Sequence, residues 1–177
     1  MESLSIAHAD PVDIADLADL AARTFPLACP PSVTAKNIAS FVDANLSRAR
    51  FAEYLADPRR VVLTASIDGR IVGYVMLIGG VGDDPDVHRV VRIHPAAELS
   101  KMYVVADQHG SGVSTALMDA ALVAAREWDV GCVWLGVNQK NARAQRFYEK
   151  SGFTVKGTRS FRLGDHTEHD YVMVRLL

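Results

Sequence analysis

The stretch that most restricts the fold is a strand-like segment that runs through a Gly-rich turn into a helical pattern. The segment "ELSKMYVVA" at residues 98–106 alternates as a strand does, and "DQHGSGV" comes directly after it with two glycines. Apolar residues then recur at the spacing of one helical face: Val113, Leu117, Ala121, Ala124 and Trp128. The sequence therefore predicts a strand, a tight turn and a helix in direct succession.

This turn has two interpretations when it is taken alone. The first N–H groups of a helix are unpaired and the helix dipole favours negative charge there, so the turn is able to bind an anion. It lacks the Lys-Ser/Thr pair of a nucleotide-binding P-loop and the three spaced glycines of a dinucleotide site. Two glycines before a helix also serve simply to reverse the chain. Local sequence leaves both interpretations open.

The segments before this unit are predicted as a strand, three helices and a hairpin. Residues 4–8 alternate as a short strand, and residues 9–25 have helical spacing with Asp10 as the cap. Residues 33–57 are predicted as two short helices. The segments "RRVVLTASI" and "RIVGYVMLIGG" flank an Asp-Gly pair at 68–69, which is a strong β-hairpin signal.

The remaining segments complete the expected pattern. The stretch "VGDDPDVHRVVRIHPAA" is polar and Pro-punctuated, so it is predicted as a loop, with or without a short strand. Residues 132–137, "CVWLGV", are predicted as a strand, and "NARAQRFYEKSG" as a helix that Gly152 ends. The tail from residue 153 is predicted as a closing hairpin.

Composition excludes several classes of protein. A chain of 177 residues that is 49% hydrophobic fits one globular domain. A net charge of -2 with dispersed Lys and Arg argues against nucleic-acid binding. No apolar run reaches the roughly 20 residues of a membrane span, and "MESLSIAHAD" lacks signal-peptide features, so we expect a cytoplasmic protein without a membrane partner. Cys29 and Cys132 form neither a disulfide framework nor a metal cluster.

The segments "ELSKMYVVADQHGSGVSTALM", "VWLGV" and "NARAQRFYEKSGF" together resemble the GCN5-related N-acetyltransferase (GNAT) superfamily. The resemblance covers roughly residues 60–177 and implies an α/β (α+β) fold, with residues 1–177 forming one domain. It implies a mixed central sheet of six to seven strands flanked by helices, in which two splayed strands form the cofactor cleft. The implied cosubstrate is acetyl-CoA, and no metal is needed.

The resemblance assigns the Gly-rich turn to the coenzyme A pyrophosphate. The family signature is Arg or Gln, two residues, Gly, one residue, then Gly or Ala; His109, Gly112 and Ser114 stand at those positions, so only the central Gly is kept. Backbone N–H donors are implied from a continuous stretch: His109, Gly110, Ser111, Gly112, Val113 and Ser114. In the preceding strand, the main chain is implied to bind the pantetheine arm and acetyl carbonyl at Met102, Tyr103, Val104 and Val105. Gly136 is expected near the point where the two strands diverge.

The helix predicted at residues 141–152 carries a polar residue, a small residue and a phenol on one face. Asn141, Ala144 and Tyr148 are spaced i, i+3, i+7. They also match the family pattern N-x-x-A-x-x-F-Y, which implies that the cofactor passes Asn141 and Ala144 and that Tyr148 is the general acid for the departing thiolate. Without that context, a helical Tyr more often packs on a sheet with its hydroxyl in water.

An amine acceptor has to lose a proton before it attacks, since its pKa is near about 10.4. Glu98 starts the strand that leads into the turn, and in many relatives a carboxylate there acts through ordered water. Glu98 as a base and Glu98 as a solvated strand end remain equally open. Tyr103, His88 and His94 are weaker candidates for the base.

The tail resembles the PaiA-type polyamine acetyltransferases, with matches at Phe161, Gly164, Asp165, Asp170 and Met173. Spermidine and spermine are then the implied acceptors, and such cations favour an acidic cleft. The run Asp83, Asp84 and Asp86 either contributes to that cleft or forms a solvated surface.

Three questions stay open from the sequence. The acceptor is a polyamine or instead a protein N-terminus, a lysine or an amine-bearing antibiotic. The fold catalyses acetyl transfer or only binds acetyl-CoA as a sensor. The oligomeric state stays open between a monomer and a homodimer.

Overall fold

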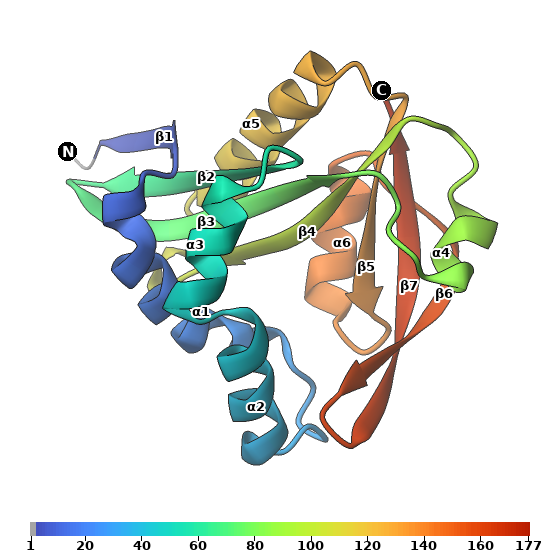
Figure 1. Cartoon of the computed structure of the whole chain (residues 1–177), viewed down its shortest axis with the longest axis horizontal. Helices are drawn as coiled ribbons and strands as arrows, with labels where there is room; N and C mark the ends of the chain where they lie inside the picture. Colours follow the sequence, from blue (N-terminus) through green and yellow to red (C-terminus); the bar gives the residue numbers. More distant parts are fainter. Residues whose placement is uncertain (1–2) are drawn as a thin grey trace.

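The computed structural model describes residues 3–177, with the side chain of Phe161 outside the described part. Among these residues, seven strands form one sheet in the order β1-β2-β3-β4-β5-β7-β6 (Figure 1). The strands are β1 (Leu4–His8), β2 (Arg60–Ile67), β3 (Arg70–Gly79), β4 (Ala96–Val104), β5 (Cys132–Asn138), β6 (Thr154–Leu163) and β7 (His166–Leu176). The tail residue Phe161 is therefore placed only by its backbone, within β6.

The helices follow the predicted positions with one addition. They are α1 (Ile14–Ala28), α2 (Ala35–Asn45), α3 (Arg48–Ala56), α4 (Pro85–Val90), α5 (Val113–Glu127) and α6 (Ala142–Lys150), with 3-10 turns η1 (Pro11–Asp13) and η2 (Ala106–Gln108). Thr34 and Ser47 accept backbone N–H groups at the starts of α2 and α3, which explains why residues 33–57 form two helices. Asp10 caps η1 rather than α1, in a reciprocal capping box with Asp13.

The stretch predicted as a loop contains α4. Asp84 accepts the N–H of Asp86 at 2.9 Å, and Pro85 occupies the first helical turn. Val87 and Val91 are buried in a cluster with Trp134. Gly157 in β6 leaves room for Val90, since a Cβ there would collide with the Val90 side chain. Polar composition was misleading at this site because three valines within it pack on the sheet.

Helices cover both faces of the sheet at β3. Tyr74 in β3 packs its ring edge to face on Phe51 of α3 at 5.6 Å, whereas its neighbour Gly73 lies against Leu117 of α5. Because consecutive strand residues point to opposite faces, α3 and α5 lie on opposite sides of the sheet (Figure 1). A Cβ on Gly73 would lie 3.1 Å from Leu117 Cδ1, so the glycine lets α5 approach closely.

Strands β4 and β5 are the only parallel neighbours within residues 3–177, and they separate after three paired positions. The pairs are Ala96 with Cys132, Ala97 with Val133 and Glu98 with Trp134. Beyond Glu98, β4 stays with β3 and β5 stays with β7, so the two strands diverge (Figure 1). The sheet is therefore mixed, has seven strands and contains the expected splayed pair; we call the opening the β4–β5 split.

Candidate active site

The turn at the end of β4 presents unpaired backbone donors. Gly110 and Gly112 have φ of 81° and 93°, and no atom lies within 4 Å of a Cβ added to either, so conformation rather than crowding requires glycine there. Four N–H groups of the turn and first helical residues donate to no described residue: those of Gly110, Gly112, Val113 and Ser114. They stand at the positive end of the α5 dipole, where an anion is favoured.

The turn departs from expectation at His109 and Ser111. The His109 N–H donates to the Ala106 carbonyl at 3.2 Å, and the Ser111 N–H donates to the Gln108 carbonyl at 3.3 Å. The His109 ring instead lies with Nε2 at 2.8 Å from the Val104 carbonyl oxygen. These two residues therefore fix the turn to the end of β4, while the donors around them stay free. Thr115 adds a further N–H without a partner among the described residues, which the sequence pattern did not mark.

The free edge of β4 borders the β4–β5 split. The Val105 N–H donates to Val72 in β3 at 2.9 Å, and its carbonyl accepts from Gln108, so Val105 offers no main-chain group to the split. Because the main-chain groups of successive strand residues alternate in direction, those of Tyr103 also face β3, whereas those of Met102 and Val104 face the split. Met102 thus presents both of its backbone groups there.

Helix α6 carries Tyr148, which packs against the hydrophobic core and lies within electrostatic range of Tyr103 in β4. Asn141 is the N-cap, since its Oδ1 accepts from the Ala144 N–H at 3.2 Å. Tyr148 lies with its ring centroid 6.0 Å from that of Phe153. Gly152, with φ of 94°, ends the helix beside Arg175. Burial raises the pKa of Tyr148 to about 12, so the phenol keeps its proton at neutral pH.

A β-bulge in β4 collects charged and phenolic side chains on the face of the sheet that carries Tyr74. Met76 pairs with Lys101 and Leu77 with Leu99, which leaves Ser100 unmatched. Without that extra residue, Glu98 and Tyr103 would point to opposite faces, because five residues separate them. With it, Glu98, Lys101 and Tyr103 share the face of Tyr74. We call this the charged face; it also carries Trp134 and Gly136 of β5, Glu168 and Asp170 of β7, and Arg159 of β6.

Glu98 lies at the apex of the split. Burial raises the pKa of its carboxyl group, and the charges of Arg159, Lys101 and Arg60 oppose that shift. Burial also lowers the pKa of Lys101, which the charge of Glu98 opposes. A carboxylate with a raised pKa is a stronger base than a solvated one, so the environment of Glu98 suits proton abstraction.

Arg159 spans the charged face next to the split. Its Nε lies 3.1 Å from Asp170 Oδ2, and its guanidinium carbon lies 5.7 Å from the ring centroid of Trp134. A Cβ on Gly136 would lie 2.6 Å from the same carbon, so Gly136 makes room for Arg159. No sequence spacing marked Arg159, because its neighbours come from two other strands.

The sequence of this chain matches a known protein family. The model of the Acetyltransferase (GNAT) family matches residues 15–153. The chain belongs to the GNAT acetyltransferase family. An uncharacterized N-acetyltransferase of Mycobacterium tuberculosis strain H37Rv is 62% identical over 165 residues, which cover 93% of this chain and 98% of the relative. The mycothiol acetyltransferase of Propionibacterium freudenreichii is 30% identical over 63% of this chain and 33% of its own length.

A solved structure shows the same fold. The PaiA N-acetyltransferase of Thermoplasma acidophilum, solved in complex with coenzyme A, superposes with a TM-score of 0.79 at 18% identity and covers 99% of both chains. The GNAT chain is accordingly an acyl-CoA-dependent N-acetyltransferase with acetyl-CoA as its cosubstrate. The free amides at the start of α5 and the open space around Gly110 and Gly112 fit a phosphate-bearing cosubstrate.

Other candidate residues of the GNAT chain lie away from the split. Asp84 caps α4, and Asp86 pairs with Arg89 and accepts the N–H of Ser160. His88, in α4, lies with Nε2 2.7 Å from the Gly82 carbonyl oxygen. His94 precedes β4 at the end where β4 and β5 are still paired. Asp84, Asp86 and His88 therefore bond in and around α4.

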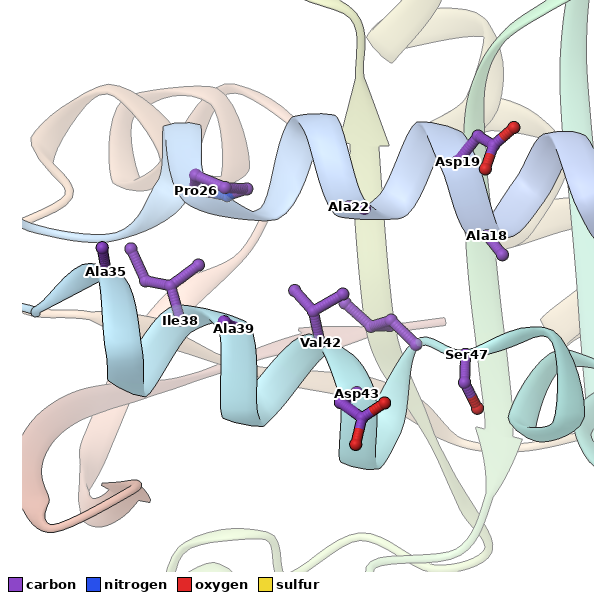
Figure 2. Close-up of a pocket in the computed structure, with 11 residues that line it drawn as sticks. Ala18, Asp19, Ala22, Pro26, Ala35, Ile38, Ala39, Val42, Asp43 and Ser47 are labelled. Atoms are coloured by element: carbon purple, nitrogen blue, oxygen red, sulfur yellow. The ribbon is translucent and has the colours of Figure 1, made fainter.

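An apolar groove of about 560 Å³ runs between α1 and α2 (Figure 2). Ala22 and Pro26 line it from α1, and Ile38 and Val42 from α2. None of its lining residues comes from β4, β5, α5 or α6, so it is separate from the split. Within residues 3–177, no helix has both the length and the apolarity to cross a membrane. The same residues contain no group of three His, Cys, Asp or Glu side chains placed to hold a metal.

Proposed function

We propose that this GNAT enzyme is a cytoplasmic polyamine N-acetyltransferase that uses acetyl-CoA to acetylate a primary amine of spermidine or spermine. One arrangement carries the proposal: the β4–β5 split has unpaired amides at one end and Glu98 with Tyr103 on the charged face, and Tyr148 of α6 lies within electrostatic range of Tyr103. Free thiols at Cys29 and Cys132 fit a reducing compartment.

The cosubstrate would lie along the turn and the free edge of β4. The N–H groups of Gly110, Gly112, Val113 and Ser114 would donate to the pyrophosphate, with the α5 dipole adding to the attraction. The backbone groups of Met102 and the N–H of Val104 would bind the pantetheine arm and polarise the thioester carbonyl. Ala144 leaves space along α6 for this arm. In this geometry His109 and Ser111 shape the turn rather than donate their N–H groups.

The amine would approach from the charged face. Glu98 takes a proton from the ammonium group, directly or through a water, and leaves a neutral amine. The amine nitrogen forms a bond to the thioester carbonyl carbon, and the carbon–sulfur bond breaks. Tyr148 gives its proton to the sulfur, and the proton released by the new amide nitrogen restores the phenol. The products are the N-acetyl amine and free coenzyme A thiol, and the balance needs no metal.

Three features support a polyamine as the acceptor. The tail motif resembles PaiA-type enzymes, and the PaiA structure superposes over the whole chain. Three carboxylates lie on the charged face: Glu98, Glu168 and Asp170. Lys101 and Arg159 share this face, but of the three carboxylates only Asp170 is paired with one of them, so Glu98 and Glu168 are the groups that attract a cationic acceptor. The acidic run before α4 contributes nothing to this support, because Asp84 and Asp86 are bonded within the α4 region.

Thiol release from acetyl-CoA in the presence of an amine panel tests the proposal. The panel contains spermidine, spermine, lysine, a peptide with a free N-terminus and an aminoglycoside. We expect saturable acceleration by spermidine and spermine and little by the others. A preference for the peptide, lysine or aminoglycoside would replace the acceptor and keep the enzyme class. Acetyl-CoA binding with no thiol release for any amine would indicate a binding module.

A further inference from the structure

Glu168 is a buried carboxylate on the charged face. The residue is 4% exposed, and alternation along β7 places it on the same face as Asp170, Val172 and Val174. Val174 lies opposite Trp134, which in turn pairs with Glu98. Six strand residues therefore separate Glu168 from the level of Glu98, a span of about 20 Å along β7. Glu168 lies toward the open end of the split, and Glu98 lies at its apex.

The charge of Glu168 is poorly compensated. No Lys or Arg nitrogen of the described residues lies within 4.0 Å of its carboxylate, and its Oε1 accepts no hydrogen bond. His166 Nε2 lies 3.2 Å from that oxygen, without a hydrogen bond between them. The neighbouring carboxylate differs, because Asp170 has Arg159 at 3.1 Å. A buried carboxylate oxygen without a hydrogen-bond donor is unfavourable, so Glu168 lacks the compensation that Arg159 gives Asp170.

The surroundings of Glu168 connect it to the reaction end of the split. Burial raises the pKa of the Cys29 thiol to about 11, and the charge of Glu168 acts in the same direction, so Glu168 lies near the end of α1. Burial raises the pKa of Tyr103, and the nearby Tyr148, Cys29 and Asp170 add to the shift. Glu168 therefore lies within electrostatic range of Cys29, and both Cys29 and Tyr148 lie within that range of Tyr103.

The hairpin that carries Glu168 is held against α2. Asn37 donates to Asp165 Oδ1 at 2.7 Å, and Gly164 leaves room for the Asn37 side chain. The Lys140 Nζ lies 3.4 Å from Ser32 Oγ, which brings the α1–α2 connection against the β5–α6 connection. These contacts fix the position of the Glu168 carboxylate relative to the split.

We infer that Glu168 binds a second ammonium group of the acceptor while the first amine is acetylated. The inference rests on the proposed function and names a specificity residue within it. A substrate ammonium can donate to both carboxylate oxygens and supply the missing positive charge. The distance from the apex favours elongated amines with more than one cationic nitrogen over short monoamines.

The test compares spermidine with N-butyl-1,3-diaminopropane, which has the same carbon chain and lacks one terminal amine. In Glu168→Gln, we expect the KM for spermidine to rise about 10- to 100-fold, the usual effect of losing a charged hydrogen bond. The KM for the analogue stays within twofold in that variant. Glu168→Asp keeps the charge and recovers part of the spermidine affinity. Glu127→Gln, an exposed carboxylate at the end of α5, is the matched control and changes neither KM.

Two additional readouts separate this inference from the proposed function. The melting temperature of Glu168→Gln equals or exceeds that of the wild type, because no Lys or Arg of the described residues pairs with Glu168. Calorimetry measures spermidine binding to the protein with coenzyme A and needs no turnover. Weaker binding in Glu168→Gln without turnover of any amine keeps the Glu168 site and overturns the proposed function. Wild-type spermidine kinetics in Glu168→Gln overturn the Glu168 site and keep the function. Absence of both binding and turnover in the wild type overturns both.

Discussion

The two sides of the β4–β5 split are built in different ways. The proposed cosubstrate side consists of backbone groups from the end of β4 and the start of α5, which are continuous in sequence. The charged face consists of side chains from β4, β5, β6 and β7, which strand register brings together. The first side therefore depends on local conformation, and the second depends on long-range pairing. Substitutions should separate these two dependences.

The largest expected effect is that of Gly112→Asp. A carboxylate placed among the free amides repels the pyrophosphate, and an L side chain is strained at φ of 93°. We expect acetyl-CoA binding to weaken by at least about 100-fold by calorimetry, at the scale of two lost charged hydrogen bonds. Circular dichroism should show a folded protein, because the added Cβ meets no atom within 4 Å.

Gly82→Asp is the matched control for that variant. Gly82 has φ of 66° and equally open surroundings, but it lies in the connection before α4. It should carry similar backbone strain and leave acetyl-CoA affinity unchanged. Equal loss of affinity in both variants would attribute the effect to stability, and normal affinity in Gly112→Asp would refute the role of the turn.

Tyr148→Phe should affect turnover and leave cosubstrate binding intact. A general acid contributes about 10²- to 10⁴-fold to a rate, and the loss should appear in kcat while the acetyl-CoA Kd stays within twofold. Because burial raises the pKa of Tyr148 to about 12, the phenol stays protonated and sets no alkaline limb below that pH. Unchanged turnover across a pH series would remove Tyr148 from the chemistry.

Glu98→Gln tests the charged face through its pH dependence. Burial raises the pKa of Glu98, so its basic form, and with it kcat/KM, increases as pH rises through a value above the ordinary range for Glu. The variant should lose about 10²-fold in kcat and lose this acidic limb. An unaltered pH profile of kcat/KM in the variant would show that Glu98 is not the base.

Gly136→Ala should disturb only the charged face. The added methyl group would displace the Arg159 guanidinium, since its Cζ lies 2.6 Å from the Cβ position. We expect the spermidine KM to rise by roughly 3- to 10-fold, a loss of about 1 kcal/mol of the kind seen for one hydrogen bond. The acetyl-CoA Kd should stay constant. Gly79→Ala is the control, because its Cβ would make an ordinary 3.7 Å contact with Arg59.

The smallest expected effect is that of Asp83→Asn. Asp83 is exposed next to α4, outside the split, so the spermidine KM should remain within twofold. Steady-state kinetics at low ionic strength would reveal any long-range attraction most clearly. A large rise in the spermidine KM would show that the acidic run at residues 83–86 contributes to binding of the acceptor.

The sequence was informative where local rules determine the structure. The Asp68-Gly69 hairpin, the two helices before it and the end of α6 at Gly152 all result from turn and cap chemistry. The Gly-rich turn was located correctly, because glycine at positive φ before a helix is a local property. The use of the His109 N–H inside the turn was not visible in the sequence.

The charged face was mostly invisible in the sequence. The bulge at Ser100, which places Glu98 and Tyr103 on one face, depends on the register of β3 against β4. Likewise, Arg159 reaches the split only because Gly136 in another strand has no side chain. Helix α4 was missed because its buried valines are packed by β6, which is distant in sequence.

The central claim is that free backbone amides at the start of α5 hold the cosubstrate in the β4–β5 split. The most direct measurement is a residue-resolved amide NMR titration with coenzyme A, combined with hydrogen exchange. The signals of Gly110, Gly112, Val113 and Ser114 should shift and become protected, whereas those lining the α1–α2 groove should not change. Unchanged amides in this turn, with shifts confined to the α1–α2 groove, would contradict the claim.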